Sequence, residues 1–171
     1  IFHSMVGLHP TSVNEKYLEV LETLRESAHN HQFCGVGEIG LDFYWDKTFA
    51  AEQVVALKEQ IGWAIEWNLP IALHVRKAMP ETIETLKCFK KECLRGVFHS
   101  FSGSIESAIE IARLGDFYYG INGVVTFKNA GIAEVVKELP LNRIVLETDC
   151  PYLTPVPFRG KRNESGYVLH V

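Results

Sequence analysis

The sequence predicts an α/β fold, specifically a (β/α)8 TIM barrel of which about six βα units lie within the 171 residues. Two observations predict this fold. First, apolar runs typical of strands alternate with periodic segments typical of helices, as in parallel sheets built from βαβ units. Second, side chains that can bind a metal ion follow several of the apolar runs. Only a strongly curved sheet brings the ends of so many strands together.

Composition is ordinary for one globular domain, since 47% of the residues are hydrophobic and 22% are charged. The net charge of -4 argues against binding nucleic acid by phosphate neutralisation alone, but allows an enzyme that holds phosphate through metal ions. There is no linker or low-complexity tract. We therefore expect residues 1–171 to form a single, incomplete barrel domain, because both ends of the sequence fall inside expected elements.

The four cysteines are scattered without Cys-x-x-Cys spacing, which is typical of reduced thiols in a cytoplasmic protein: Cys34, Cys88, Cys93 and Cys150. The sequence contains no signal peptide and no apolar stretch long enough to cross a bilayer. We therefore expect a cytoplasmic protein without a membrane partner.

The alternation of elements can be followed along the chain. Strands are expected at residues 2–8, 33–40, 70–76, 96–101, 117–123 and 143–149. Helices are expected at 14–28, 48–67, 80–90, 105–114 and 132–139, with Thr48 and Ser104 as N-caps and Pro80 in a first turn.

Four of these strands end in a possible metal ligand: Glu38, His74, His99 and Asp149. Glu38 interrupts a run that otherwise reads as a fully buried strand, and a buried carboxylate is costly unless it is paired or coordinates a metal. One such carboxylate or histidine would usually be structural. Four of them at the carboxyl ends of strands, where α/β folds keep their sites, indicate a common centre.

Geometry favours the barrel over an open sheet. Glu38 lies on the second expected strand and Asp149 on the sixth, so a flat sheet would separate them by roughly 19 Å. Bonds to such metals are only about 2.0–2.2 Å long. An open doubly wound sheet is the alternative, but Gly35-x-Gly37-x-x-Gly40 is not followed by the helix that a dinucleotide site requires.

Imidazole and carboxylate ligands suit Zn²⁺, Mn²⁺, Fe²⁺ or Mg²⁺. Glu38 could bridge two metal ions, and two ions about 3.5–4 Å apart can activate water for phosphodiester cleavage. Asp149 could be a ligand, the base that orients the water, or both. Glu147 should point to the same side of its strand as Asp149, and could support the site or pair with Arg143 or Arg162.

Substrate contacts are expected from basic groups near the mouth of the barrel. Arg159 and Arg162 follow the last strand, where barrels often bind phosphate, although a solvated charged run is an equal possibility. Arg76 lies two residues past His74. His9 ends the first strand and could contact substrate or only form a turn.

Six segments together resemble the TatD family of metal-dependent deoxyribonucleases: residues 7–10, 37–42, 73–76, 99–103, 147–153 and 159–164. The resemblance implies an amidohydrolase-type (β/α)8 barrel with 3′–5′ exonuclease or related phosphodiesterase activity on DNA 3′ ends. We expect no obligate protein partner. It implies two divalent metal ions, Mg²⁺, Mn²⁺ or Zn²⁺. Glu38 would bridge them, His74 and His99 would bind one, and Asp149 would serve the other and the attacking water.

The sequence departs from the family pattern at the His-x-His pair of the family's first strand, which nothing here supplies. We therefore expect the 171 residues alone to be impaired as an enzyme. Two alternatives stay open: a metal-dependent hydrolase of a small ester, amide or lactone, and a metal-poor barrel that only binds a ligand or partner.

Overall fold

The computed structural model describes residues 2–28 and 32–171, and its strands form one parallel six-stranded sheet in the order β1-β2-β3-β4-β5-β6. The strands are β1 (Met5–Val6), β2 (Gly35–Asp42), β3 (Ile71–Arg76), β4 (Arg95–His99), β5 (Asp116–Ile121) and β6 (Ile144–Leu146). The α-helices are α1 (Tyr17–Ala28), α2 (Ala50–Glu66), α3 (Met79–Lys87), α4 (Ile105–Ile111) and α5 (Ile132–Glu138). Short 3-10 helices include η1 (Pro10–Ser12), η2 (Gly123–Thr126) and η4 (Ser165–His170).

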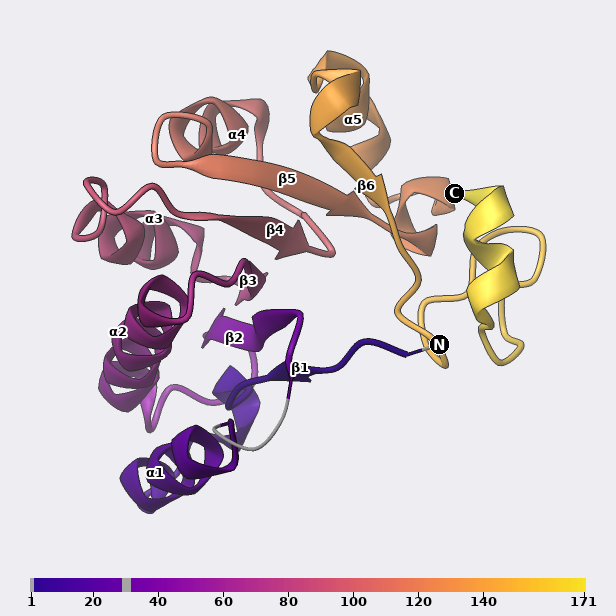
Figure 1. Cartoon of the computed structure of the whole chain (residues 1–171). Coiled ribbons are helices and arrows are strands. Elements are labelled where there is room, and N and C mark those ends of the chain that lie inside the picture. The colour runs from indigo at the N-terminus through magenta and orange to yellow at the C-terminus, as the bar shows by residue number, and fades with distance from the viewer. Residues whose placement is uncertain (1, 29–31) are drawn as a thin grey trace.

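The sheet curves through space, and the helices lie along its outer side (Figure 1). Every strand pairs in parallel with the strand that precedes and follows it in sequence. This sequential, all-parallel order with a helix between strands is that of a partial TIM barrel, as the sequence predicted.

The core lies between the sheet and its helices. Helix α2 buries Leu57 and Ile61 completely, as its apolar stripe predicted, against a cluster that includes Ile39 and Leu73 of the sheet. Two polar side chains of α2 are also buried, because they hydrogen-bond to strand backbone: Gln53 to Asp42, and Gln60 to Leu8. Helix α2 therefore fixes the carboxyl ends of strands as well as filling the core.

Strand β2 carries the irregularity that positions the first carboxylate. Its register against β3 shifts between Val36 and Ile39, and Glu38 lies in this interval. Such bulges often re-aim a side chain next to an active site. Gly40, at φ 143°, faces the backbone of His74 so closely that a side chain would collide with it.

The predicted elements are all present; β1, β3, β4, β5 and β6 are shorter than expected, whereas β2 reaches Asp42 and so extends beyond the expected end at residue 40. Strand β6 ends at Leu146, so Glu147 and Asp149 lie in the segment that follows it. Ser104 caps α4 by accepting a hydrogen bond from the Ser107 backbone, as predicted. The prediction for Thr48 was wrong: Phe49 occupies the N-cap, and Thr48 instead hydrogen-bonds to Asp46.

Among the described residues, no helix is long and apolar enough to cross a membrane.

Candidate metal centre

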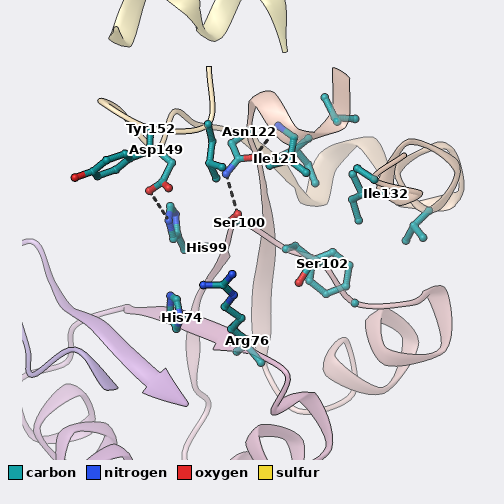
Figure 2. Close-up of a pocket in the computed structure, with 18 of the residues that line it drawn as sticks. His74, Arg76, His99, Ser100, Ser102, Ile121, Asn122, Ile132, Asp149 and Tyr152 are labelled. Carbon is teal, nitrogen blue, oxygen red and sulfur yellow. Dashed lines mark hydrogen bonds and ion pairs between the residues drawn. The ribbon is translucent and has the colours of Figure 1, made fainter. Parts of the chain in front are cut away.

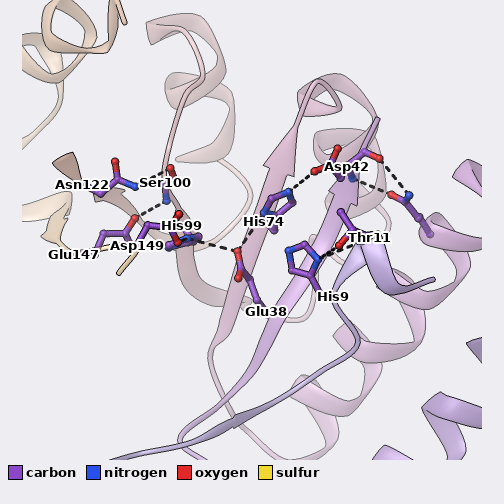
Figure 3. A network of polar contacts seen from close by, with 11 residues as sticks. His9, Thr11, Glu38, Asp42, His74, His99, Ser100, Asn122, Glu147 and Asp149 are labelled. Atoms are coloured by element: carbon purple, nitrogen blue, oxygen red, sulfur yellow. Dashed lines mark hydrogen bonds and ion pairs between the residues drawn. The ribbon is translucent and has the colours of Figure 1, made fainter. Parts of the chain in front are cut away.

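The predicted metal ligands converge at the carboxyl edge of the curved sheet. His74 of β3 and His99 of β4 are register partners, so both side chains lie side by side on the same face. Glu38 approaches them from β2, and Asp149 approaches from the segment after β6 (Figure 3). Side chains separated by more than a hundred positions in sequence are thus brought to one site.

His99 connects the two carboxylates. Its Nε2 lies 3.4 Å from Asp149 Oδ1 and 3.7 Å from Glu38 Oε1. The other ring nitrogen, Nδ1, lies 2.9 Å from Glu147 Oε2. The imidazole therefore presents Nε2 to the centre while Glu147 holds it from behind, the arrangement in which a carboxylate fixes the orientation of a metal-binding histidine.

His74 presents its other ring nitrogen, Nδ1, to the centre. Its Nδ1 lies 3.3 Å from Glu38 Oε1, and its Nε2 lies 2.9 Å from Asp42 Oδ2. Asp42 is almost fully buried, and its other oxygen accepts the backbone N–H of Tyr44 at 2.9 Å. Asp42 thus orients His74 as Glu147 orients His99, a role that the sequence reasoning did not assign.

Glu147 occupies a site that the backbone shapes for it. Its Oε1 accepts the Ser100 N–H at 2.6 Å. Its carboxylate packs over Gly120 of β5, where any side chain would overlap with it. The Ser100 hydroxyl in turn accepts a hydrogen bond from Asn122 Nδ2 at 2.8 Å. Glu147 does not pair with Arg143, whose guanidinium bonds to Asp116 instead.

His9 lies in the same cluster, packed edge-on against the His74 ring with centroids 4.5 Å apart. Its Nδ1 also accepts the Thr11 backbone N–H at 3.2 Å, so it caps η1 as a turn histidine would. Its position follows from Leu8, whose backbone N–H donates to the buried Gln60 side chain at 2.6 Å.

The donor set fits a metal ion. One ligand atom from each of His9, Glu38 and His74 lies within 4.8 Å of the other two. Glu38 Oε1 is in addition close to both His74 and His99. Neutral imidazoles and carboxylates are the ligands of Zn²⁺, Mn²⁺ and Fe²⁺ sites, and carboxylates also suit Mg²⁺. His9 therefore belongs with the possible ligands, whereas the sequence indicated only a substrate contact or a turn.

The charged groups of the centre and their burial shift the pKa values of its histidines and carboxylates. Burial opposes the charged form of His99, but contacts with Asp149 and Glu147 raise its pKa to about 10. Burial has the same effect on His74, yet Glu38 and Asp42 raise its pKa. Contact with His99 lowers the pKa of Asp149, and contacts with the histidines lower that of Glu38 despite its burial. Burial and the neighbouring His74 lower the pKa of His9.

A cavity of about 720 Å³ opens over these residues (Figure 2). Glu38, His74, His99 and Asp149 line it, together with His9. This volume lies in the range of small-ligand sites, about 300–1,000 Å³. The predicted ligands therefore face a space that a substrate can enter.

The predicted basic residues divide into two groups. Arg76 lines the cavity, and its guanidinium lies 3.9 Å from the centroid of the Tyr44 ring. Arg159 and Arg162 are exposed and lie outside the cavity lining. Arg159 stacks on Phe127, 3.6 Å from the ring centroid. Two polar lining residues, Ser100 and Asn122, were not predicted, although Asn122 directly follows an apolar strand as the other site residues do.

The sequence matches the TatD related DNase family over residues 1–171. The chain belongs to this family. It is 42% identical to the uncharacterized metal-dependent hydrolase YabD of Bacillus subtilis, over 99% of the chain and 66% of that protein. It is also 33% identical to the 3'-5' ssDNA/RNA exonuclease TatD of Pantoea ananatis, over 98% of the chain and 66% of that protein.

The fold agrees with this TatD membership. The crystal structure of YjjV, a TatD homolog from Escherichia coli K12, superposes with a TM-score of 0.83 at 30% identity. The match covers 97% of this chain and 64% of that one. The hydrolase TatD family protein of Entamoeba histolytica has the same fold, with a TM-score of 0.77. The chain spans about two thirds of the length of the TatD-family relatives it matches.

Proposed function

We propose that this chain carries the catalytic centre of a metal-dependent phosphodiesterase, a 3′–5′ deoxyribonuclease that acts on DNA 3′ ends. The observation that carries the proposal is the meeting of Glu38, His74, His99 and Asp149 at one cavity. The name of the Pantoea ananatis relative, a 3'-5' ssDNA/RNA exonuclease, supports nucleic acid as the substrate.

Glu38 is proposed to bridge two divalent ions, Mg²⁺, Mn²⁺ or Zn²⁺, with His74, His99 and Asp149 as further ligands. His9 joins this set because its ring lies in the cluster with Glu38 and His74. Divalent cations held here would lower the pKa of a water molecule and polarise a phosphoryl oxygen.

Asp149 is proposed as the group that receives the proton of the attacking water. Contact with His99 lowers its pKa, so the carboxylate is ionised at neutral pH and can accept a proton. Arg76 is proposed to hold a phosphate oxygen, because a guanidinium offers a planar fork to such groups. Arg159 and Arg162 are proposed to contact more distant phosphates of a longer substrate.

Hydrolysis of a small ester, amide or lactone is the second candidate. The part of the cavity away from the ligands is lined by apolar side chains such as Ile132, which an organic group without phosphate would also suit. In either case the free cysteines support a cytoplasmic location. Residues 1–171 are proposed to form a single, incomplete barrel domain.

The test is a comparison of substrates with the purified protein and Mn²⁺ or Mg²⁺. We expect stepwise shortening of a 5′-labelled single-stranded oligonucleotide, and no shortening when its 3′ end is blocked. EDTA should abolish the reaction. Rapid hydrolysis of simple esters or lactones with intact DNA would instead establish the second candidate. Because residues 1–171 alone are expected to be impaired as an enzyme, the comparison is made with the rate that the metal ion gives without protein, and no substrate hydrolysed above that rate would contradict both.

A further inference from the structure

The cavity has an apolar half that the ligand cluster does not use. This half is formed mainly by the segment after β5, and Ile132 stands there on the side away from His74 and Asp149 (Figure 2). Its walls are the side chains of Phe101, Val124, Val125, Ile132 and Val135.

These walls are anchored in the core. Phe101 is 4% exposed and Ile132 is 7% exposed, so their positions are fixed by packing. Val124 and Val125 are partly buried and pack against the same core. The apolar half is thus a preformed surface, as ligand sites usually are.

A phosphate would not be held in this half. Among the described residues that line the cavity, the basic side chains are His9, His74, His99 and Arg76, and these belong to the metal-ligand half or its edge. The polar side chains near the apolar wall are uncharged: serine hydroxyls and the amide of Asn122. Ser100 Oγ accepts a hydrogen bond from Asn122 Nδ2, and Ser102 brings a second hydroxyl to the cavity lining.

An apolar surface with a few neutral donors and acceptors beside a phosphate-handling centre matches a nucleotide, which joins a flat ring with polar edges to a phosphate. We propose that the apolar half binds the nucleobase adjacent to the scissile phosphodiester. This inference rests on the proposed function. It adds how the substrate is recognised: an unpaired base is buried against Val125 and Ile132. Burying apolar surface contributes about 25 cal/mol per Å², so covering one face of a base is expected to change binding by about tenfold or more.

The test compares two oligonucleotides with the metal-loaded protein, one with an intact 3′-terminal thymidine and one with an abasic 3′ residue. Wild type should cleave the intact substrate about tenfold or more faster in kcat/KM. Ala130→Trp adds bulk at an exposed position that lines the cavity, so no core contact is lost. It should remove the preference for the intact substrate. Asn129→Trp, at the exposed neighbour outside the lining, is the matched control and should keep the preference.

Equal cleavage of both substrates by wild type, or a preference that survives in Ala130→Trp, would overturn the inference. A binding measurement keeps it testable if the proposed function fails and neither substrate is cleaved. Calorimetry should then show thymidine 5′-monophosphate binding about tenfold tighter than deoxyribose 5-phosphate, with the difference lost in Ala130→Trp. Equal affinity for the two compounds would overturn the base site independently of catalysis.

Discussion

Glu38 and Asp149 face the same atom. Glu38 Oε1 lies 3.7 Å and Asp149 Oδ1 lies 3.4 Å from Nε2 of His99. The two carboxylates come from β2 and from the segment after β6, which a flat sheet would hold roughly 19 Å apart. Their proximity shows that curvature of the sheet creates the centre, and the predictions below test what that centre does.

Asp149→Asn should lower kcat for oligonucleotide cleavage by about 10²–10⁴-fold, because the amide cannot accept the proton of the attacking water. The substitution preserves the shape of the side chain, so the unfolding midpoint should change little. Steady-state kinetics with Mn²⁺ checks this. Glu164→Gln, at an exposed position outside the cavity lining, is the control and should keep wild-type activity. An Asp149→Asn enzyme with near wild-type kcat would exclude Asp149 as the base.

Glu147→Gln should weaken metal binding or activity by about 10–100-fold, because the carboxylate that holds His99 Nδ1 is removed. Gly120→Ala should have the same effect, since its methyl group would overlap with the Glu147 carboxylate. Metal titration by calorimetry measures both. Gly166→Ala is the matched control because a methyl group there meets open space. If both test variants lose only stability and keep metal affinity, Glu147 is a structural residue alone.

Gln60→Leu should destabilise the fold by about 1–3 kcal/mol, because the buried backbone N–H of Leu8 loses its acceptor. Leu8 precedes His9, so the variant should also weaken metal binding. Urea unfolding measures the change in free energy. Lys58→Leu, at an exposed position on the same helix, is the control. Equal stability of the two variants would show that the Gln60 hydrogen bonds contribute little.

Metal binding should release protons, and affinity should fall as pH falls. The raised pKa of His99, about 10, means that its imidazole is protonated at pH 8 without metal, whereas a ligand must be neutral. Calorimetry in buffers of different ionisation enthalpy counts the protons released, and His99→Gln should release about one fewer.

The stability of the metal-free chain should depend on pH in the opposite direction: it falls as pH rises, whereas metal affinity increases. Because the folded pKa exceeds the unfolded value near 6.5, this stabilisation of the metal-free chain is complete below about pH 6.5 and lost as pH rises through about 10. Metal uptake without proton release would contradict the predicted loss of the His99 proton on metal binding.

The sequence allowed Glu38, His74, His99 and Asp149 to be selected because each follows an apolar strand run. The same signal was present at Asp42 and Asn122, but the expected second strand ended at residue 40, and the fifth was expected to run through Asn122 to residue 123. Asp42 is in fact the last residue of β2, and Asn122 follows directly on β5.

Other relationships depend on strand pairing and packing that no local pattern contains. The carboxylate of Glu147 lies over Gly120 because β5 pairs with β6, and this contact places it against His99 rather than Arg143. Arg159 lies outside the cavity lining, where its guanidinium stacks on the ring of Phe127. Which of several possible partners a side chain contacts depends on the folded structure, and the local sequence does not determine it.

The most direct test of the metal centre is anomalous diffraction from crystals of the protein grown with Mn²⁺. We predict one or two anomalous peaks in the cavity, with at least one within bonding distance of Glu38 and of an imidazole nitrogen of His74 or His99. Full Mn²⁺ occupancy elsewhere, with no peak beside Glu38, would contradict the central claim that these strand ends form a metal site.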